Sequence, residues 1–219
     1  MKFFSVILGL STLAGGLGLS GTVASPAGSA DNVSQPRAVS GFDRVRIQGA
    51  FNTSIIAGAH ETRVLLTANS DMLDMITTTV QSHTLVVSLR EGLVLADRVP
   101  TIAISLPVLR ALTQDGAVTT TVMGLNGGDF DLDTSGSGRL TASGRASRET
   151  VTLNGASKID TTGIDARDVI VANNSGGLAE VRASDSLIAN VNGVGEIRFT
   201  GSVKRVESHV NGGGSIRRI

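Results

Sequence analysis

The sequence predicts an all-β chain that folds as a single-stranded parallel β-helix, a solenoid in which successive coils stack on one another. Three observations predict this fold class. A three-residue phrase centred on glycine recurs at intervals of 17 to 21 residues through the second half of the chain. Aliphatic residues alternate with polar residues on both sides of each phrase. The composition combines 27 glycines with only 3% aromatic residues, which suits a narrow interior filled by small side chains.

Each phrase is interpreted as a tight corner of one coil. Glycine tolerates the positive φ angles that sharp corners need, and the Asn or Ser that usually precedes it favours turns. Stacked corners would also allow asparagine side chains to hydrogen-bond along the axis of the stack. The expected structural corners are Gly116, Gly136, Gly155, Gly176, Gly193 and Gly212.

Side chains at the fourth and sixth positions after a corner glycine are predicted to point inward, because strand residues alternate between two faces. They are Leu140, Ile159, Ile197 and Ile216 at the fourth position and Val122, Ala142, Thr161 and Phe199 at the sixth. The fourth copy of the phrase, around Gly176, matches this inward pattern only when the count restarts at Gly177. This predicts a one-residue bulge at that corner. Arg218 takes the sixth position in the last copy, where a charge is expected only if that coil meets solvent.

The chain divides into three parts. Residues 1–30 are predicted to be a signal peptide and cleavage region, because a positive start, an apolar run and small-residue cleavage sites follow one another. Residues 31–41 are expected to form a flexible lead. Residues 42–219 are expected to form a single β-helix domain, less regular over 42–111 and with regular coils over 112–219. The less regular part is predicted to contain strands at 42–47, 54–57, 63–67, 84–89 and 101–106, a helical turn at 71–76 and a loop at 91–100.

An antiparallel β-sandwich is the alternative fold, because Asn-Gly is the strongest short hairpin signal. The phrases nevertheless repeat as whole two-strand units with corners in equivalent places, which hairpins do not require. A coil of this length buries its apolar face only when it stacks on its neighbours, at a spacing of ~4.8 Å. This favours the solenoid.

Several phrases carry a resemblance to a known family. They include Phe42-Asp43-Arg44-Val45, Ile104-Ser105-Leu106-Pro107-Val108-Leu109, Asn192-Gly193-Val194-Gly195-Glu196-Ile197 and Asn211-Gly212-Gly213-Gly214-Ser215-Ile216. On these residues the region from about 40 to 219 resembles the head GIN domain family, whose members are described as candidate autotransporter adhesins and as a domain of unknown function. The resemblance implies a right-handed β-helix that is exported from a bacterium, and it supplies no catalytic set.

Charge and cysteine content exclude several function classes. Nineteen basic and nineteen acidic residues give no net charge and form no long block, so a nucleic-acid partner is not expected. The chain has no cysteine and therefore no disulfide. No transmembrane segment is predicted in the mature chain. The expected location is the periplasm, the cell surface or the extracellular space of a bacterium.

No catalytic, cofactor-binding or metal site is predicted. Asp129, Asp131 and Asp133 resemble a calcium loop, but Thr134 and Leu140 stand where glycine and glutamate are needed, so a solvated strand face is expected. The histidines His60, His83 and His209 lie on separate segments. A polysaccharide lyase or hydrolase using Asp160 with Asp165 or Lys158 is supported by fold analogy alone.

The sequence therefore predicts an exported, non-catalytic binding or adhesion-type protein at the cell envelope. The partner would be an envelope component, a glycan or another protein. The alternatives are a structural envelope protein without a dedicated ligand and a polysaccharide lyase or hydrolase. The expected surface contacts are Thr120, Lys158, Asp160, Glu196, Arg198 and Arg217.

Overall fold

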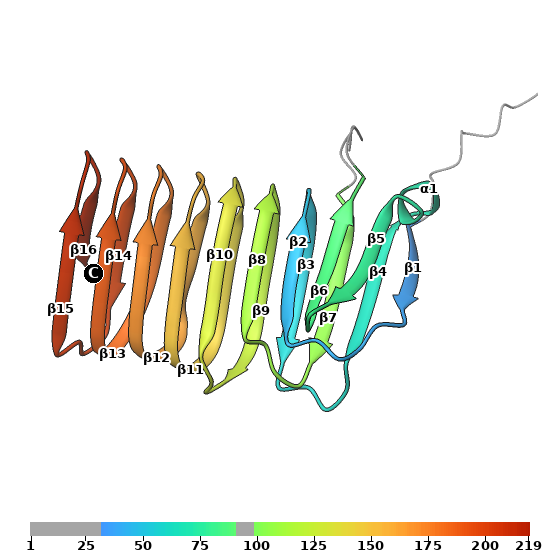
Figure 1. Cartoon of the computed structure of the whole chain (residues 1–219), viewed down its shortest axis with the longest axis horizontal. Coiled ribbons are helices and arrows are strands. Elements are labelled where there is room, and N and C mark those ends of the chain that lie inside the picture. Colours follow the sequence, from blue (N-terminus) through green and yellow to red (C-terminus); the bar gives the residue numbers. More distant parts are fainter. Residues whose placement is uncertain (1–31, 91–98) are drawn as a thin grey trace, which may run out of the picture.

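The computed structural model describes residues 32–90 and 99–219. The signal peptide and cleavage region predicted over 1–30, and most of the loop predicted over 91–100, lie outside these residues. In the described part, strands stand side by side along one long axis, with the C-terminus at one end and α1 (Ser70–Leu73) and β1 (Asn32–Arg37) at the other (Figure 1). Figure 1 shows the strands in two layers, which are called here the first and second sheets.

The first sheet begins with an antiparallel pair and continues in parallel. Its strands, in spatial order, are β5 (Ile76–Gln81), β6 (Thr84–Leu89), β2 (Arg44–Gln48), β8 (Ala111–Gly116), β10 (Phe130–Gly136), the second halves of β11 (Arg139–Leu153), β12 (Lys158–Asn173) and β13 (Leu178–Val191), and β15 (Arg205–Val210).

The second sheet faces the first. Its strands, in spatial order, are β1, β4 (Arg63–Asn69), β7 (Thr101–Leu106), β3 (Phe51–Ala57), β9 (Val118–Asn126), the first halves of β11, β12 and β13, β14 (Glu196–Thr200) and β16 (Ser215–Arg218). The long strands β11, β12 and β13 bend and so belong to both sheets.

These pairings confirm the parallel β-solenoid. Corresponding residues of successive coils lie opposite one another, as in the register Leu140 with Ile159 and Val151 with Val171. The antiparallel sandwich is wrong, because antiparallel pairing among the described strands is confined to β1 with β4, β4 with β7 and β5 with β6. All three pairs lie at the N-terminal end of the stack.

The N-terminal half joins the same stack, but not in chain order. Strand β2 pairs in parallel with both β6 and β8, and β3 pairs in parallel with both β7 and β9. The coil that contains β2 and β3 therefore lies inside the stack. The chain next adds the coil of β6 and β7 on one side of it, and then continues with β8 and β9 on the other side. Strands β1, β4 and β5 cover the outer end, which closes the apolar interior there.

Three local expectations need correction. The flexible lead predicted at 31–41 contains β1, which pairs along its whole length with β4. Most of this segment is therefore an ordered strand. The helical turn predicted at 71–76 is shorter, Ser70–Leu73, and β5 follows it. β5 was not predicted, because its threonine-rich run lacks a clear apolar alternation.

The inward positions predicted from the corner glycines are confirmed. Leu140, Ile159 and Ile197 are at most 1% exposed. Val181 is fully buried, as predicted, but it is the sixth residue of a count that starts at Ser175 and not at Gly177, because Ala179 lies opposite both Ile159 and Ile197. In the last coil Val206 is 50% exposed, and the exposed Arg218 donates from Nη2 to the Gly201 carbonyl at 2.7 Å, as expected of a coil that meets solvent.

Five of the six predicted corner glycines stack in one column, and Gly176 does not. A Cβ on Gly136 would lie 2.6 Å from the carbonyl oxygen of Gly116, and one on Gly193 would lie 2.8 Å from that of Ser175. Ser175 therefore takes the place expected for Gly176. The column runs through Gly116, Gly136, Gly155, Ser175, Gly193 and Gly212.

Asparagine side chains beside this column bond along the axis, as predicted. The Asn174 amide donates to Asn154 Oδ1 at 3.0 Å, and the Asn192 amide donates to Asn174 Oδ1 at 2.8 Å. At the start of the column the Ser135 hydroxyl donates to Asp115 at 2.6 Å. Each bond joins neighbouring coils, so the corners are held in register by side chains as well as by the backbone.

Candidate functional site

Five of the six predicted contact residues lie on the outer face of the second sheet. Lys158 and Asp160 come from β12, Glu196 and Arg198 from β14, and Arg217 from β16. They occupy the positions that alternate with the buried residues of the same strands. The alternation of the strands thus explains their shared face.

Thr120 is wrong as a contact residue. It is 1% exposed and its hydroxyl accepts a hydrogen bond from the buried Gln114 side chain. Thr120 is the fourth residue after Gly116, so the counting rule that places Leu140 inward places Thr120 inward too. Its polarity suggested an outward position that its register does not allow.

The outward charges form one chain of ion pairs, called here the ion-pair ladder. Lys158 Nζ lies 3.7 Å from Glu180 Oε2, Arg198 lies 3.1 Å from Glu180 and 2.9 Å from Glu196, and Arg217 pairs with Glu196. The hydrogen bond from Arg198 lowers the pKa of Glu196, and Arg217 adds to this effect. Opposite charges on four successive coils thus hold one another in place.

Glu180 is the member of the ladder that the sequence analysis missed. It joins Lys158 to Arg198 across the intervening coil. The signal for it was present, because restarting the count at Gly177 places Val181 inward and therefore Glu180 outward. Asp160 lies beside the ladder, where its carboxylate accepts from the Thr162 amide at 3.1 Å and hydroxyl at 2.6 Å.

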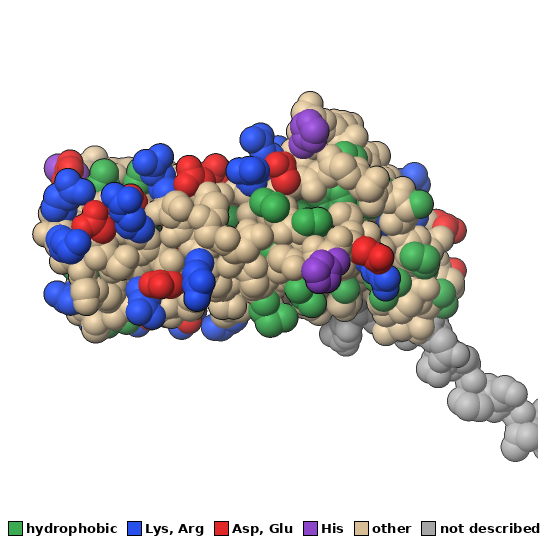
Figure 2. All heavy atoms as spheres, turned by 90° about the horizontal axis from the view of Figure 1, so that it is seen from below, with side chains coloured by type: hydrophobic (Ala, Val, Ile, Leu, Met, Phe, Trp, Pro, Cys, Tyr) green, Lys and Arg blue, Asp and Glu red, His purple; other side chains and the backbone are tan. Residues whose placement is uncertain are grey.

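A second charged surface runs along the corners opposite the glycine column, and is called here the lower edge. It consists of the turns 107–110, 126–129 and 201–205 and the bends of β11, β12 and β13 at 144–148, 163–168 and 183–186. Figure 2 faces this edge and shows Lys, Arg, Asp and Glu side chains interspersed toward the C-terminal end, with more hydrophobic side chains toward the other end.

Some charges of the lower edge are paired. Arg110 lies 3.1 Å from Asp43, and Asp185 lies 3.2 Å from Lys204, 3.6 Å from Arg205 and 3.8 Å from Arg167. The hydrogen bond from Lys204 is the main cause that lowers the pKa of Asp185. These pairs again join different coils.

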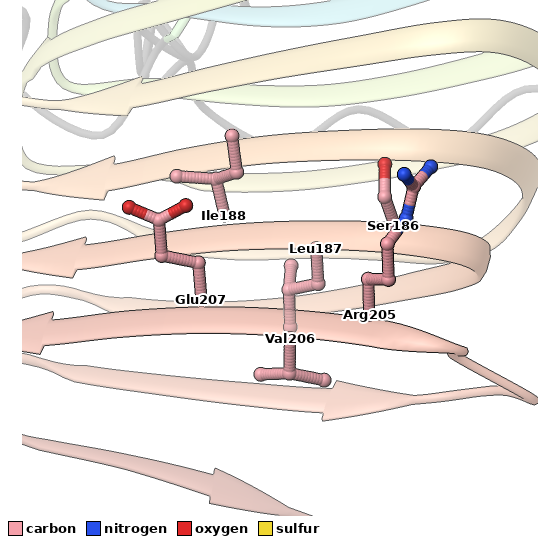
Figure 3. Close-up of a pocket in the computed structure, with 6 residues that line it drawn as sticks. All are labelled: Ser186, Leu187, Ile188, Arg205, Val206 and Glu207. Carbon is pink, nitrogen blue, oxygen red and sulfur yellow. The ribbon is translucent and has the colours of Figure 1, made fainter.

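Hollows open at several places on the described surface. Two lie on the lower edge, with volumes of about 480 and about 190 Å³. A third, of about 440 Å³, lies over the last two strands of the first sheet. In Figure 3 Ser186, Ile188, Arg205 and Glu207 project to one side of these strands and Val206 to the other. In this third hollow Arg205 pairs with Asp185, and Glu207 Oε1 lies within hydrogen-bonding distance of His209 Nε2, at 3.0 Å.

The acidic run on β10 and the three histidines do not assemble into a site among the described residues. Asp131 and Asp133 are exposed on β10 while Phe130 and Leu132 are buried, as expected of a solvated face. Residues 32–90 and 99–219 contain no group of three or more His, Asp or Glu side chains that could hold a metal ion. His60, His83 and His209 are exposed on different segments.

One acid lies in the core and was not predicted. Glu149 is 0% exposed, and neither of its carboxyl oxygens has a hydrogen-bond partner among the described residues. Burial raises the pKa of Glu149 to about 7. The sequence around it, Arg148-Glu149-Thr150, is polar, so only the register of β11 with Phe130 and Val169 shows that Glu149 points inward.

Fold and surface together define a parallel β-solenoid that presents flat polar sheet faces and a charged edge. Residues 41–203 match the family described as "Putative auto-transporter adhesin, head GIN domain". The chain belongs to this family, which confirms the resemblance found in the sequence. No curated protein matches the chain significantly.

Several solved structures from bacteria have a similar fold. A "putative adhesin" from Bacteroides fragilis NCTC 9343 is 19% identical with a TM-score of 0.68, covering 87% of this chain and 98% of that one. A "putative adhesin" from Parabacteroides merdae ATCC 43184 is 13% identical with a TM-score of 0.49, covering 88% and 98%. A "putative lipid binding protein" from Parabacteroides distasonis ATCC 8503 is 17% identical with a TM-score of 0.45, covering 88% and 98%. At these identities the first structure supports the fold alone.

The helix content is very small. No helix in the described ranges is long and apolar enough to cross a membrane.

Proposed function

We propose that this chain is an exported, non-catalytic binding protein of the adhesion type that acts at the bacterial cell envelope. The observation that carries the proposal is membership of a family described as adhesins. Because a fold by itself does not determine a function, the contact surface has to come from the side chains. The partner is an envelope component, a glycan or another protein.

The proposed contact surface is the outer face of the second sheet around the ion-pair ladder, with Lys158, Asp160, Glu196, Arg198 and Arg217 as contact residues. Their charges repeat from coil to coil at the ~4.8 Å spacing of neighbouring strands. Arg198 contacts two carboxylates, so its side chain is already ordered. Side chains that are ordered before binding lose less conformational entropy on contact with a partner.

The arrangement of carboxylates supports a non-catalytic role. Glycan hydrolysis needs two carboxyl groups that face one another across the scissile bond. Asp160 lies on the outer face, where Thr162 occupies one of its oxygens, whereas Asp165 lies on the lower edge. The two acids that the sequence offered for this chemistry therefore lie on different surfaces.

Sedimentation of the purified protein with isolated bacterial envelopes tests this proposal. We expect Lys158→Gln with Arg217→Gln to weaken retention roughly tenfold, about 1.4 kcal/mol. The matched control is Arg44→Gln with Lys204→Gln, which changes the net charge equally on other surfaces and is expected to bind as wild type. Equal retention of both variants would contradict the proposed surface. Release of soluble glycan fragments from the envelopes would contradict the non-catalytic role.

A further inference from the structure

The two hollows of the lower edge adjoin one another and are together called here the corner groove. Asp129 and Arg145 line both hollows. The larger one extends along the bends of β11 and β12 to Arg148 and Asp165, and the smaller one extends back to the turn before β8. The corner groove therefore runs across successive coils, along the axis of the stack. The larger hollow, with a volume of about 480 Å³, by itself lies in the range of small-ligand sites, which is ~300–1,000 Å³.

Charges of both signs line the corner groove, and only some of them are paired: Arg110 with Asp43, and Arg167 with Asp168 and Asp185. Arg145 lies directly opposite Asp165 in the register of β11 with β12. Even so, among the described residues neither of these two groups, nor Asp129 or Arg148, takes part in an ion pair within 4.0 Å. All four side chains belong to exposed residues.

Two other clusters of charges on the surface are closed by ion pairs. On the same edge Asp185, which does not line the groove, pairs with Lys204. On the second sheet the ion-pair ladder joins its charges across four coils. Within the corner groove, Asp129, Arg145, Arg148 and Asp165 thus form a group of exposed donors and acceptors that can bond with a ligand.

The floor of the smaller hollow is apolar. Leu109, Leu125 and Phe130 line it and are at most 6% exposed. Asn126 and Arg145 stand at its rim. A ligand that fits this hollow therefore needs an apolar face as well as polar groups around it.

The mixture of charges selects the class of ligand. A polyanion would be repelled by Asp129 and Asp165, and a polycation would be repelled by Arg145 and Arg148, so a strongly charged polymer of either sign is disfavoured. A hydroxyl group can donate to a carboxylate and accept from a guanidinium, and hydrogen bonds to charged groups are the stronger kind. A sugar ring carries such hydroxyls around its edge and C–H groups on its faces.

From these contacts we propose that the corner groove binds a neutral oligosaccharide, whose chain lies along the axis of the solenoid. Asp129 and Asp165 accept hydrogen bonds from its hydroxyls, and Arg145 and Arg148 donate to them. This inference rests on the proposed function as a binding protein. It adds a ligand class and a second surface, distinct from the ion-pair ladder.

Isothermal titration with linear neutral hexasaccharides tests the inference, with cellohexaose, maltohexaose and chitohexaose as probes and hexagalacturonate as the acidic comparison. We expect at least one neutral probe to bind, with little dependence on salt, and Asp129→Asn with Arg145→Gln to weaken it roughly tenfold. The matched control, Asp185→Asn with Lys204→Gln, also removes one acid and one base from the lower edge, and is expected to bind as wild type.

Three results would overturn the inference. They are binding by none of the neutral probes, tighter and salt-dependent binding of hexagalacturonate, and equal loss in the control variant. The variant Lys158→Gln with Arg217→Gln distinguishes a failure of the ligand assignment from a failure of the proposed function. If it loses envelope binding while wild type binds no hexasaccharide, the ligand assignment fails and the proposed contact surface stands.

Discussion

At the scale of single residues, Glu149 stands where the neighbouring coils carry apolar side chains. Its register partners are Phe130 and Val169, both at most 1% exposed. A buried charge without a partner costs far more than a buried neutral acid, so the core favours the protonated form. This is why burial raises the pKa of Glu149 to about 7 from the ordinary value of 4.5.

This shift predicts that stability depends on pH. Below about pH 4.5 the acid is protonated in both states. Between about 4.5 and 7 only the unfolded state loses the proton, so the free energy of unfolding falls as pH rises, by on the order of 3 kcal/mol in total. Glu149→Gln removes this contribution. Urea unfolding at pH 4.5 and pH 7.5 should therefore show a larger loss for wild type than for Glu149→Gln, and equal losses in both proteins would contradict the assignment.

At the scale of elements, the glycine column decides how closely consecutive corners approach. Gly136 has φ +105°, and a Cβ there would lie 2.6 Å from the carbonyl oxygen of Gly116. Gly176 has no positive φ, and a Cβ there would meet only Val194 Cγ2, at an ordinary 3.7 Å. The same three-residue phrase thus contains glycines of two kinds, one required by the stack and one not.

A pair of alanine substitutions separates the two kinds. Gly136→Ala forces a strained backbone and a clash with the coil below, and we expect it to lower the free energy of unfolding by roughly 2–3 kcal/mol. Gly176→Ala is the control and should change it by less than ~1 kcal/mol, with a gain possible because alanine restricts the unfolded chain. Chemical denaturation of both variants measures this difference. Similar losses would show that Gly176, not Ser175, occupies the column.

At the scale of the whole molecule, periodicity predicts the solenoid and the direction of most side chains, because both follow from local repetition. Leu140, Ile159 and Ile197 are buried where counting places them, and Glu180 could have been found by the same count. The exchange of Ser175 for Gly176 escapes this reasoning because two glycines follow in succession, and the frame is fixed by contacts between coils, such as those of Ser175 with Gly155 and of Ala179 with Ile159. Asp129 and Arg145 come together across different coils, so no local pattern reveals the corner groove.

The order of the first coils also lies beyond local reasoning. Nothing in the residues of β2 says that β6, about forty residues later, lies on one side of it and β8 on the other. The consequence is that a coil near the N-terminus is a central one. β2 and β3 have parallel neighbours on both sides, whereas among the described strands β15 pairs only with β13, and β16 only with β14.

Amide hydrogen exchange should follow this spatial order rather than the chain order. Peptides that cover Arg44–Gln48 and Phe51–Ala57 should exchange slowest, because their strands open only when the stack comes apart. Peptides that cover Arg205–Val210 and Ser215–Arg218 should exchange fastest among the strands, since all residues of β15 are exposed and an edge strand can fray without breaking the core. Mass spectrometry of exchange in dilute protein measures both. Protection of β15 equal to that of β2 would mean that this edge is covered in solution, and repeating the measurement across protein concentrations would show whether a second copy covers it.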